Sequence, residues 1–67
     1  MKTPLDDAIT IAGSEQALGR LIGASQQRIN YWRRVRKGVV PAEFVLRIEE
    51  ATGINRDTLR PDIHTGA

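Results

Sequence analysis

Two helices and the turn between them are encoded in the stretch EQALGRLIGASQQRINYWRR, which runs from Glu15 to Arg34. Ser14 and Ser25 are good N-caps, so we expect helices from Glu15 to Ile22 and from Gln26 to about Lys37. The turn Gly23-Ala24-Ser25 is too short to let the helices run antiparallel. They must therefore cross steeply, as in a helix-turn-helix.

The packing demands of a helix-turn-helix are met within this stretch. Gly19 is the small residue needed where the helices approach, although such motifs more often have alanine there, and Gly23 suits the left-handed conformation of the turn. The apolar residues that would lock the helices together are Leu18, Ile22, Ala24, Ile29 and Trp32. We assign Trp32 to the core because it lies on the Ile29 face.

The rest of the chain also predicts helices. Thr3 would cap a helix from Pro4 to Ala12, Pro41 suits the first turn of a helix ending near Thr52, and Asn55 would cap a short turn containing Leu59. The other apolar positions expected in the core are Leu5, Ala8, Ile9, Ala12, Ala17, Leu21, Phe44, Val45, Ile48 and Ala51. We therefore predict an all-α domain of about five short helices over residues 1–62, followed by a frayed tail over residues 63–67.

Composition narrows the class of protein. With 40% hydrophobic and 27% charged residues, the 67-residue chain has the composition of a folded soluble domain. The absence of cysteine excludes disulfides and thiolate metal sites, and no apolar run is long enough for a membrane span. His64 has no second metal ligand nearby, and the acidic pairs Asp6-Asp7 and Glu49-Glu50 lack a nucleophile or base. We expect no enzymatic activity, no cofactor, no metal, no small-molecule substrate and a cytoplasmic location.

The distribution of charge is more informative than the net value of +2. Residues 16–42 hold six basic residues and no acidic one, whereas the remainder holds four bases and eight acids. The chain therefore combines a +6 segment with a −4 remainder, which predicts one basic surface for an anionic partner.

Ser25-Gln26-Gln27-Arg28-Ile29 resembles the start of the recognition helix in lambdoid phage repressors and Cro proteins. A longer pattern is similar to Cro-like prophage regulators and to YdaS-type antitoxins: Ser25-Gln26-Gln27, Tyr31-Trp32, Gly38-Val39-Val40-Pro41, residues 48–53 (IEEATG) and Leu59-Arg60-Pro61-Asp62. The resemblance implies a Cro/lambda-repressor-like fold, bacterial or phage origin, a place on the nucleoid and binding of double-stranded operator DNA by a dimer. The tail after Asp62 lacks the dimerisation strand of some Cro proteins, so we expect a weak homodimer that could form on DNA.

The third predicted helix would then enter the major groove and read base edges. Base-reading residues are predicted at Gln26, Gln27, Arg28, Asn30 and Tyr31, of which the resemblance itself implies Gln26, Gln27 and Tyr31. Glutamine and asparagine can pair with adenine, and Arg28 or Arg34 with guanine or a phosphate. Tyr31 would either cover its neighbours or contact a phosphate or a thymine methyl. Phosphate contacts are predicted at Ser14, Ser25, Arg33, Arg34 and Lys37, and Arg36 beside Lys37 also fits such a contact. Glu15 would repel a phosphate at Ser14 unless its side chain is turned away.

The resulting function is transcriptional repression by occupancy of an operator, with three alternatives. A YdaS-type antitoxin would also bind a toxin protein, through the acidic surface around Glu43, Glu49 and Glu50. A recombination directionality factor would need a β-hairpin wing, for which residues 36–41 are too few. A protein-interaction module would show no sequence preference on DNA.

Overall fold

The computed structural model describes residues 3–60, and all its regular structure is helical. The helices are α1 (Pro4–Ala12), α2 (Glu15–Ile22), α3 (Gln26–Arg34), α4 (Ala42–Thr52) and α5 (Arg56–Leu59). The all-α prediction is confirmed, and residues 3–60 contain no strand of the kind that a wing after α3 would require. The predicted tail over residues 63–67 and His64 lie outside the described residues. Within residues 3–60, no helix is long and apolar enough to pass through a membrane.

Local hydrogen bonds explain where the helices begin. The side chains of Thr3, Ser14, Ser25 and Asn55 each accept a hydrogen bond from a backbone N–H in the first turn that follows. At Thr3 the bond is reciprocal, because the Asp6 carboxylate accepts from the Thr3 backbone N–H at 2.9 Å. The predicted caps are confirmed because they depend only on neighbouring residues.

The third helix ends at Arg34, earlier than the predicted end near Lys37. The backbone N–H groups of Val35 and Arg36 both donate to the Tyr31 carbonyl, and that of Gly38 donates to the Trp32 carbonyl at 2.7 Å. Lys37 takes a positive φ of 52°, which closes this turn. Gly38 lies directly against the Thr3 side chain, where a Cβ would approach Thr3 Oγ1 to 2.7 Å, so the turn has room only for glycine at this position. α4 likewise begins one residue later than predicted, with Pro41 as its N-cap.

A single core joins residues from all five helices and from the α3–α4 connection. It consists of Leu5, Ala8, Leu18, Ile22, Ile29, Trp32, Val40, Phe44, Val45, Ile48 and Leu59. The rings of Trp32 and Phe44 lie 5.1 Å apart between centroids, which confirms Trp32 as a core residue. The prediction for Leu21 was wrong, since it is 58% exposed. The buried face of α2 is narrow and centred on Leu18, Gly19 and Ile22, so Leu21 lies beyond its edge.

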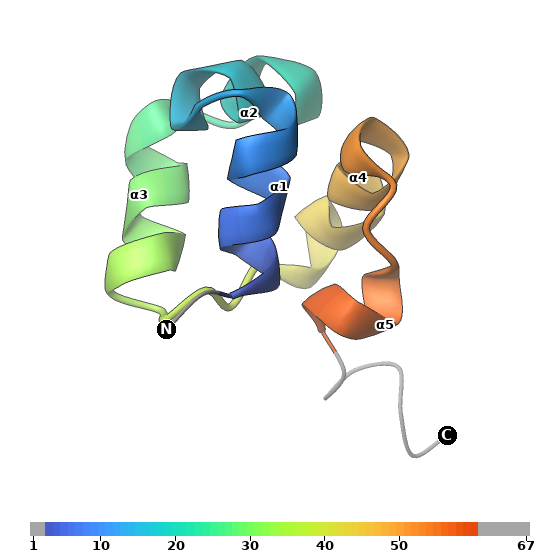
Figure 1. Cartoon of the computed structure of the whole chain (residues 1–67). Coiled ribbons are helices and arrows are strands. Elements are labelled where there is room, and N and C mark those ends of the chain that lie inside the picture. Colours follow the sequence, from blue (N-terminus) through green and yellow to red (C-terminus); the bar gives the residue numbers. More distant parts are fainter. Residues whose placement is uncertain (1–2, 61–67) are drawn as a thin grey trace.

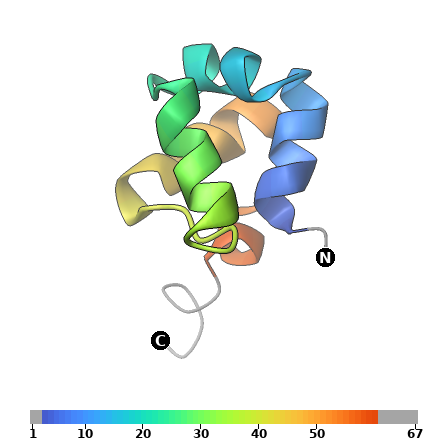
Figure 2. The same ribbon diagram turned by 90° about the vertical axis from the view of Figure 1, so that its left-hand side faces the viewer.

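The arrangement leaves α3 on the outside of the molecule. Figure 1 shows α2 crossing the top of the structure, with α3 and α1 descending from its two ends and α4 and α5 on the other side of α1. In Figure 2, turned by 90°, α3 lies in front of the other helices. The steep crossing of α2 and α3 expected from the short turn is therefore present, and it exposes one long face of α3.

Gly19 permits this crossing. The backbone N–H groups of Gly23 and Ala24 both donate to the Gly19 carbonyl, at 2.8 and 3.0 Å. This draws the turn so close to α2 that a Cβ on Gly19 would collide with the Ala24 carbonyl oxygen. The alanine common at this position in such motifs therefore does not fit this backbone.

Candidate nucleic-acid interface

The outer face of α3 carries a ridge formed by Gln27, Tyr31 and Arg34. These residues are spaced four and three apart, so they project from one side of the helix, and all three are exposed. Gln26, in the first turn of α3, is also exposed. Within residues 3–60 the four side chains form no hydrogen bond or ion pair. This outer ridge is thus available to an external partner.

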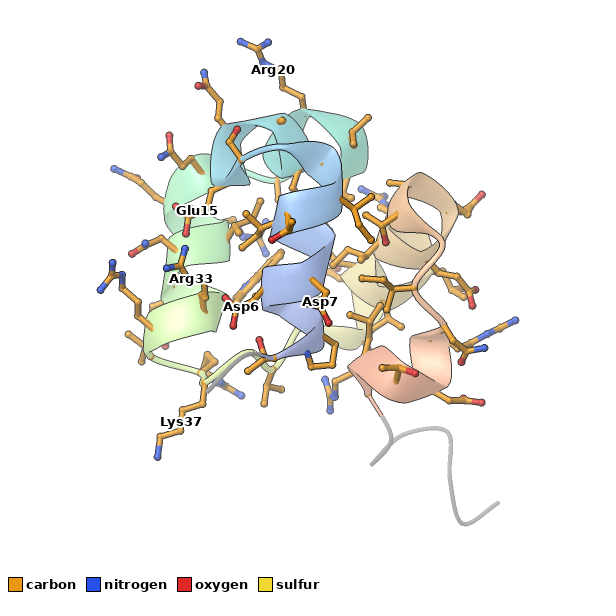
Figure 3. All side chains as sticks on the ribbon, in the orientation of Figure 1. Asp6, Asp7, Glu15, Arg20, Arg33 and Lys37 are labelled. Carbon is orange, nitrogen blue, oxygen red and sulfur yellow. The ribbon has the colours of Figure 1, made fainter. Side chains whose placement is uncertain are left out.

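Asn30 and Arg33 occupy one flank of α3 and face other helices. Arg33 Nη1 lies 2.7 Å from Glu15 Oε2 on α2, and Arg33 Nε lies 3.3 Å from Asp6 Oδ1 on α1. Asn30 Nδ2 donates to the same Glu15 oxygen at 3.4 Å. Figure 3 shows the Arg33 side chain between Glu15 and Asp6. This polar cluster fastens α3 to α1 and α2, and it engages two residues that the sequence assigned to DNA contacts.

The cluster also shows why Glu15 need not repel a phosphate bound at Ser14. The Glu15 side chain is only 13% exposed, and its carboxylate is directed at Arg33. The negative charge is therefore matched inside the protein and does not face outward beside Ser14.

Asp6 is held in its ionised form by its neighbours. The Thr3 backbone N–H donates to the Asp6 carboxylate, and this bond lowers the pKa of Asp6. The Thr3 hydroxyl and the positive charge of Arg33 lower that pKa further, and they outweigh the opposing effect of desolvation. The cluster thus unites an ionised carboxylate with a guanidinium that is always charged.

Arg28 occupies the opposite flank of α3 and packs against α4. Its guanidinium carbon lies 4.9 Å from the centroid of Phe44 and 5.7 Å from that of Trp32. Arg28 Nη2 also lies 3.8 Å from Glu43 Oε1, at the start of α4. The predicted base-reading residue is therefore directed along the surface toward α4 and not outward along the ridge.

The two predicted serines act first as helix caps. Ser14 Oγ accepts from the Ala17 backbone N–H at 3.0 Å, and Ser25 Oγ accepts from that of Arg28 at 3.1 Å. Both serines are exposed, and a hydroxyl that accepts through a lone pair can still donate its own hydrogen. Each can therefore cap its helix and donate to a phosphate oxygen.

Four of the six basic residues in the +6 segment have no ion pair within the described part of the chain. They are Arg20, Arg34, Arg36 and Lys37, of which only Arg20 was not singled out for phosphate from the sequence. Figure 3 shows Arg20 extending beyond α2 and Lys37 extending below the end of α3, so positive charge lies past both ends of the outer ridge. The six-charge segment alone did not distinguish these residues from Arg28 and Arg33, whose charges are matched by carboxylates.

Two hollows border α3. A hollow of about 470 Å³ is lined by Thr3, Asp6, Arg33 and Lys37, and one of about 280 Å³ is lined by Tyr31, Trp32, Arg36, Val39, Pro41 and Arg60. The larger one has the volume of a small-molecule site, and its lining includes the Asp6–Arg33 ion pair. Among the described residues no group of three side chains is suited to hold a metal ion.

These features define a small all-helical protein whose third helix presents a polar ridge flanked by cations that have no ion pair within residues 3–60. The chain belongs to the family described as bacterial toxin YdaS, whose model matches residues 5–67. A relative, the Gene 30 protein of Enterobacteria phage phi80, is 37% identical over 62 residues, which cover 91% of this chain and 84% of the relative. No solved structure matches the chain. The YdaS-type resemblance is confirmed, whereas the likeness to Cro rests on the sequence pattern alone.

Proposed function

We propose that this protein is a sequence-specific double-stranded DNA-binding regulator that represses transcription by occupying its operator. The observation that supports this most directly is the outer ridge of α3, whose polar side chains are exposed and form no hydrogen bond or ion pair within residues 3–60. An α-helix fits the major groove of B-DNA, which is about 12 Å wide. Occupancy needs neither catalysis nor a cofactor.

The ridge offers the chemistry needed to read bases. Gln27 and Gln26 can each donate to and accept from adenine at N6 and N7, and Tyr31 can contact a thymine methyl or a phosphate. Arg34, at the far end of the ridge, can pair with guanine or a phosphate. We assign base reading chiefly to Gln27, because it lies on the ridge near the N-terminal end of α3, the end that contacts base edges in helix-turn-helix proteins.

Phosphate contacts would hold α3 in register. The hydroxyls of Ser14 and Ser25 lie at the starts of α2 and α3, and Lys37 lies beyond the end of α3. Arg20 and Arg36 join this group because neither has an ion pair within residues 3–60. Cations beyond both ends of α3 suit the two phosphate backbones that border a groove.

Selection from a randomised duplex library with the purified chain tests this function. We expect enrichment of one short motif, and footprints on DNA flanking the gene that encodes the chain. If a dimer forms on DNA, two half-sites should lie about 34–36 Å apart or at a multiple of that spacing. Recovery of random sequence, even at low salt, would contradict the proposal and favour a protein-interaction module.

A second candidate is a role in a toxin–antitoxin pair, favoured by the description of the family as bacterial toxin YdaS. The sequence led us to expect the antitoxin member, whereas that description names the toxin. Two of the three acidic residues expected to bind a partner already form ion pairs within the chain: Glu43 pairs with Arg28, and Glu49 pairs with Arg56 at 3.6 Å. Expression of the chain alone in a bacterial host separates the roles, since a toxin arrests growth, whereas an antitoxin or a repressor of its own gene does not.

A further inference from the structure

Arg28 is the predicted base-reading residue whose surroundings fit that role least. It lies on α3 one position after Gln27, but a rotation of about 100° per residue turns it away from the outer ridge toward α4. Its guanidinium carbon lies 4.9 Å from the Phe44 ring centroid, within the range of a cation–π contact. Arg28 would have to leave this ring to reach a base edge.

Phe44 is itself held in place. The guanidinium carbon of Arg47 lies 5.4 Å from the Phe44 centroid, and Arg47 Nη1 donates to the Ile22 carbonyl of α2 at 3.2 Å. Phe44 is 5% exposed and also packs on Trp32. The Phe44 ring that Arg28 contacts is therefore part of the core. Its fixed position keeps the Arg28 guanidinium on the side of α3 that faces α4.

Glu43 is the second partner of Arg28 and is more exposed than Arg28 itself. The two side chains are 71% and 51% exposed, and their charged atoms lie 3.8 Å apart. A surface pair of this kind contributes little to folding stability because water screens both charges. Its effect changes when a phosphate backbone approaches, because an unmatched carboxylate at the edge of a DNA interface repels it.

We propose that Arg28 is a positioning residue that neutralises Glu43 beside the recognition helix and does not read a base. This inference rests on the proposed DNA-binding function and refines the contacts made by α3. Arg28 keeps the start of α4 from repelling DNA while Gln27 and Tyr31 face the groove. Glu43 in turn makes binding depend on a correctly packed Arg28.

Equilibrium titrations of four variants test the proposal, each on the selected site and on an unrelated duplex. The variants are Arg28→Ala, Glu43→Gln, the double variant Arg28→Ala/Glu43→Gln, and Arg28→Lys. Gln27→Ala is the base-reading control. Circular dichroism melts at the same salt concentration show whether each variant is folded.

We expect Arg28→Ala to weaken binding to both duplexes by a similar factor, about five- to tenfold, as removal of one close charge partner near the surface allows. The double variant should recover to within about twofold of the wild type, and Glu43→Gln alone should bind at least as tightly. Arg28→Lys should also bind well, because it keeps the charge beside Glu43 without the planar fork that pairs with guanine.

Two results would overturn the assignment of Arg28. One is a loss confined to a single base pair of the selected site, and the other is a loss that Glu43→Gln does not restore. If the wild-type chain prefers no sequence, the proposed regulator function fails, whereas the unrelated duplex still reports whether Arg28 neutralises Glu43. Absence of binding to any duplex would contradict both.

Discussion

The guanidinium of Arg33 on α3 lies 2.7 Å from the carboxylate of Glu15 on α2, although the two residues are eighteen positions apart in sequence. The same guanidinium reaches Asp6 on α1 at 3.3 Å. One side chain therefore ties the outer helix to the two helices behind it. This places Arg33 among the residues that orient α3.

Replacement of Arg33 by alanine should destabilise the fold. Glu15 is only 13% exposed, so loss of Arg33 leaves a largely buried carboxylate without its main partner. We expect the free energy of unfolding to fall by about 1–3 kcal/mol, the usual cost of leaving a buried polar group without its hydrogen-bond partner. Urea denaturation measures this, with Arg34→Ala as a control that should change stability by less than about 0.5 kcal/mol. If Arg33→Ala and Arg34→Ala lowered the free energy of unfolding equally, the ion pairs of Arg33 would contribute no measurable stability.

Replacement of Gly19 by alanine should also destabilise the fold, against the usual preference for alanine in helices. Alanine would gain about 1 kcal/mol of helix propensity. The added Cβ would collide with the Ala24 carbonyl, however, and overpacking at a rigid contact typically costs about 1–3 kcal/mol. We expect a lower melting temperature for Gly19→Ala and little change for Gln16→Ala on the exposed side of α2. A more stable Gly19→Ala protein would mean that the turn can move away.

Acid should weaken the attachment of α1 to α3. Thr3 and Arg33 lower the pKa of Asp6 in the folded state, so this carboxylate stabilises the fold above its ordinary pKa. That stabilisation is lost as the pH falls from the ordinary pKa through the lowered one. Denaturation between pH 7 and pH 2 should therefore show a steeper loss of stability for the wild type than for Asp6→Asn. Parallel curves would exclude a contribution from Asp6.

Lys37 and Arg34 should contribute to DNA affinity mainly through their positive charge. Neither has an ion pair within residues 3–60, so each can neutralise a phosphate and release counterions. We expect Lys37→Ala to weaken binding to all sequences and to reduce the slope of log K against log salt by about one. Arg34→Ala should behave in the same way if Arg34 contacts phosphate, and should lose one base preference if it contacts guanine. An unchanged slope for Lys37→Ala would remove it from the interface.

The sequence predicted most of the fold because its strongest features are local. Caps such as Ser14 and Ser25 and the glycine at Gly23 depend on neighbouring residues, and the structure has them as predicted. The end of α3 was misplaced because the sequence marked only Gly38 as the stop, whereas the chain already leaves the helix after Arg34, where Val35 and Arg36 both donate to the Tyr31 carbonyl.

The sequence predicted less of the candidate site than of the fold. Helical periodicity indicated the exposed face of α3 and so identified Gln27 and Tyr31. It could not reveal that Asn30 and Arg33 turn toward Glu15, or that Arg28 turns toward Phe44, because these partners come from other helices. The charge pattern likewise counted six bases without showing which ones are matched by carboxylates.

The most direct measurement of the central claim is a base-pair scan of the selected site, titrated with wild-type protein, Gln27→Ala and Thr58→Ala. Thr58 is an exposed residue of α5, outside the outer ridge, and serves as the control. Gln27→Ala should lose about 1–3 kcal/mol at one base pair, with its salt slope nearly unchanged, and Thr58→Ala should match the wild type. A Gln27→Ala protein with the wild-type preference at every base pair would contradict the assignment of α3 as the recognition helix.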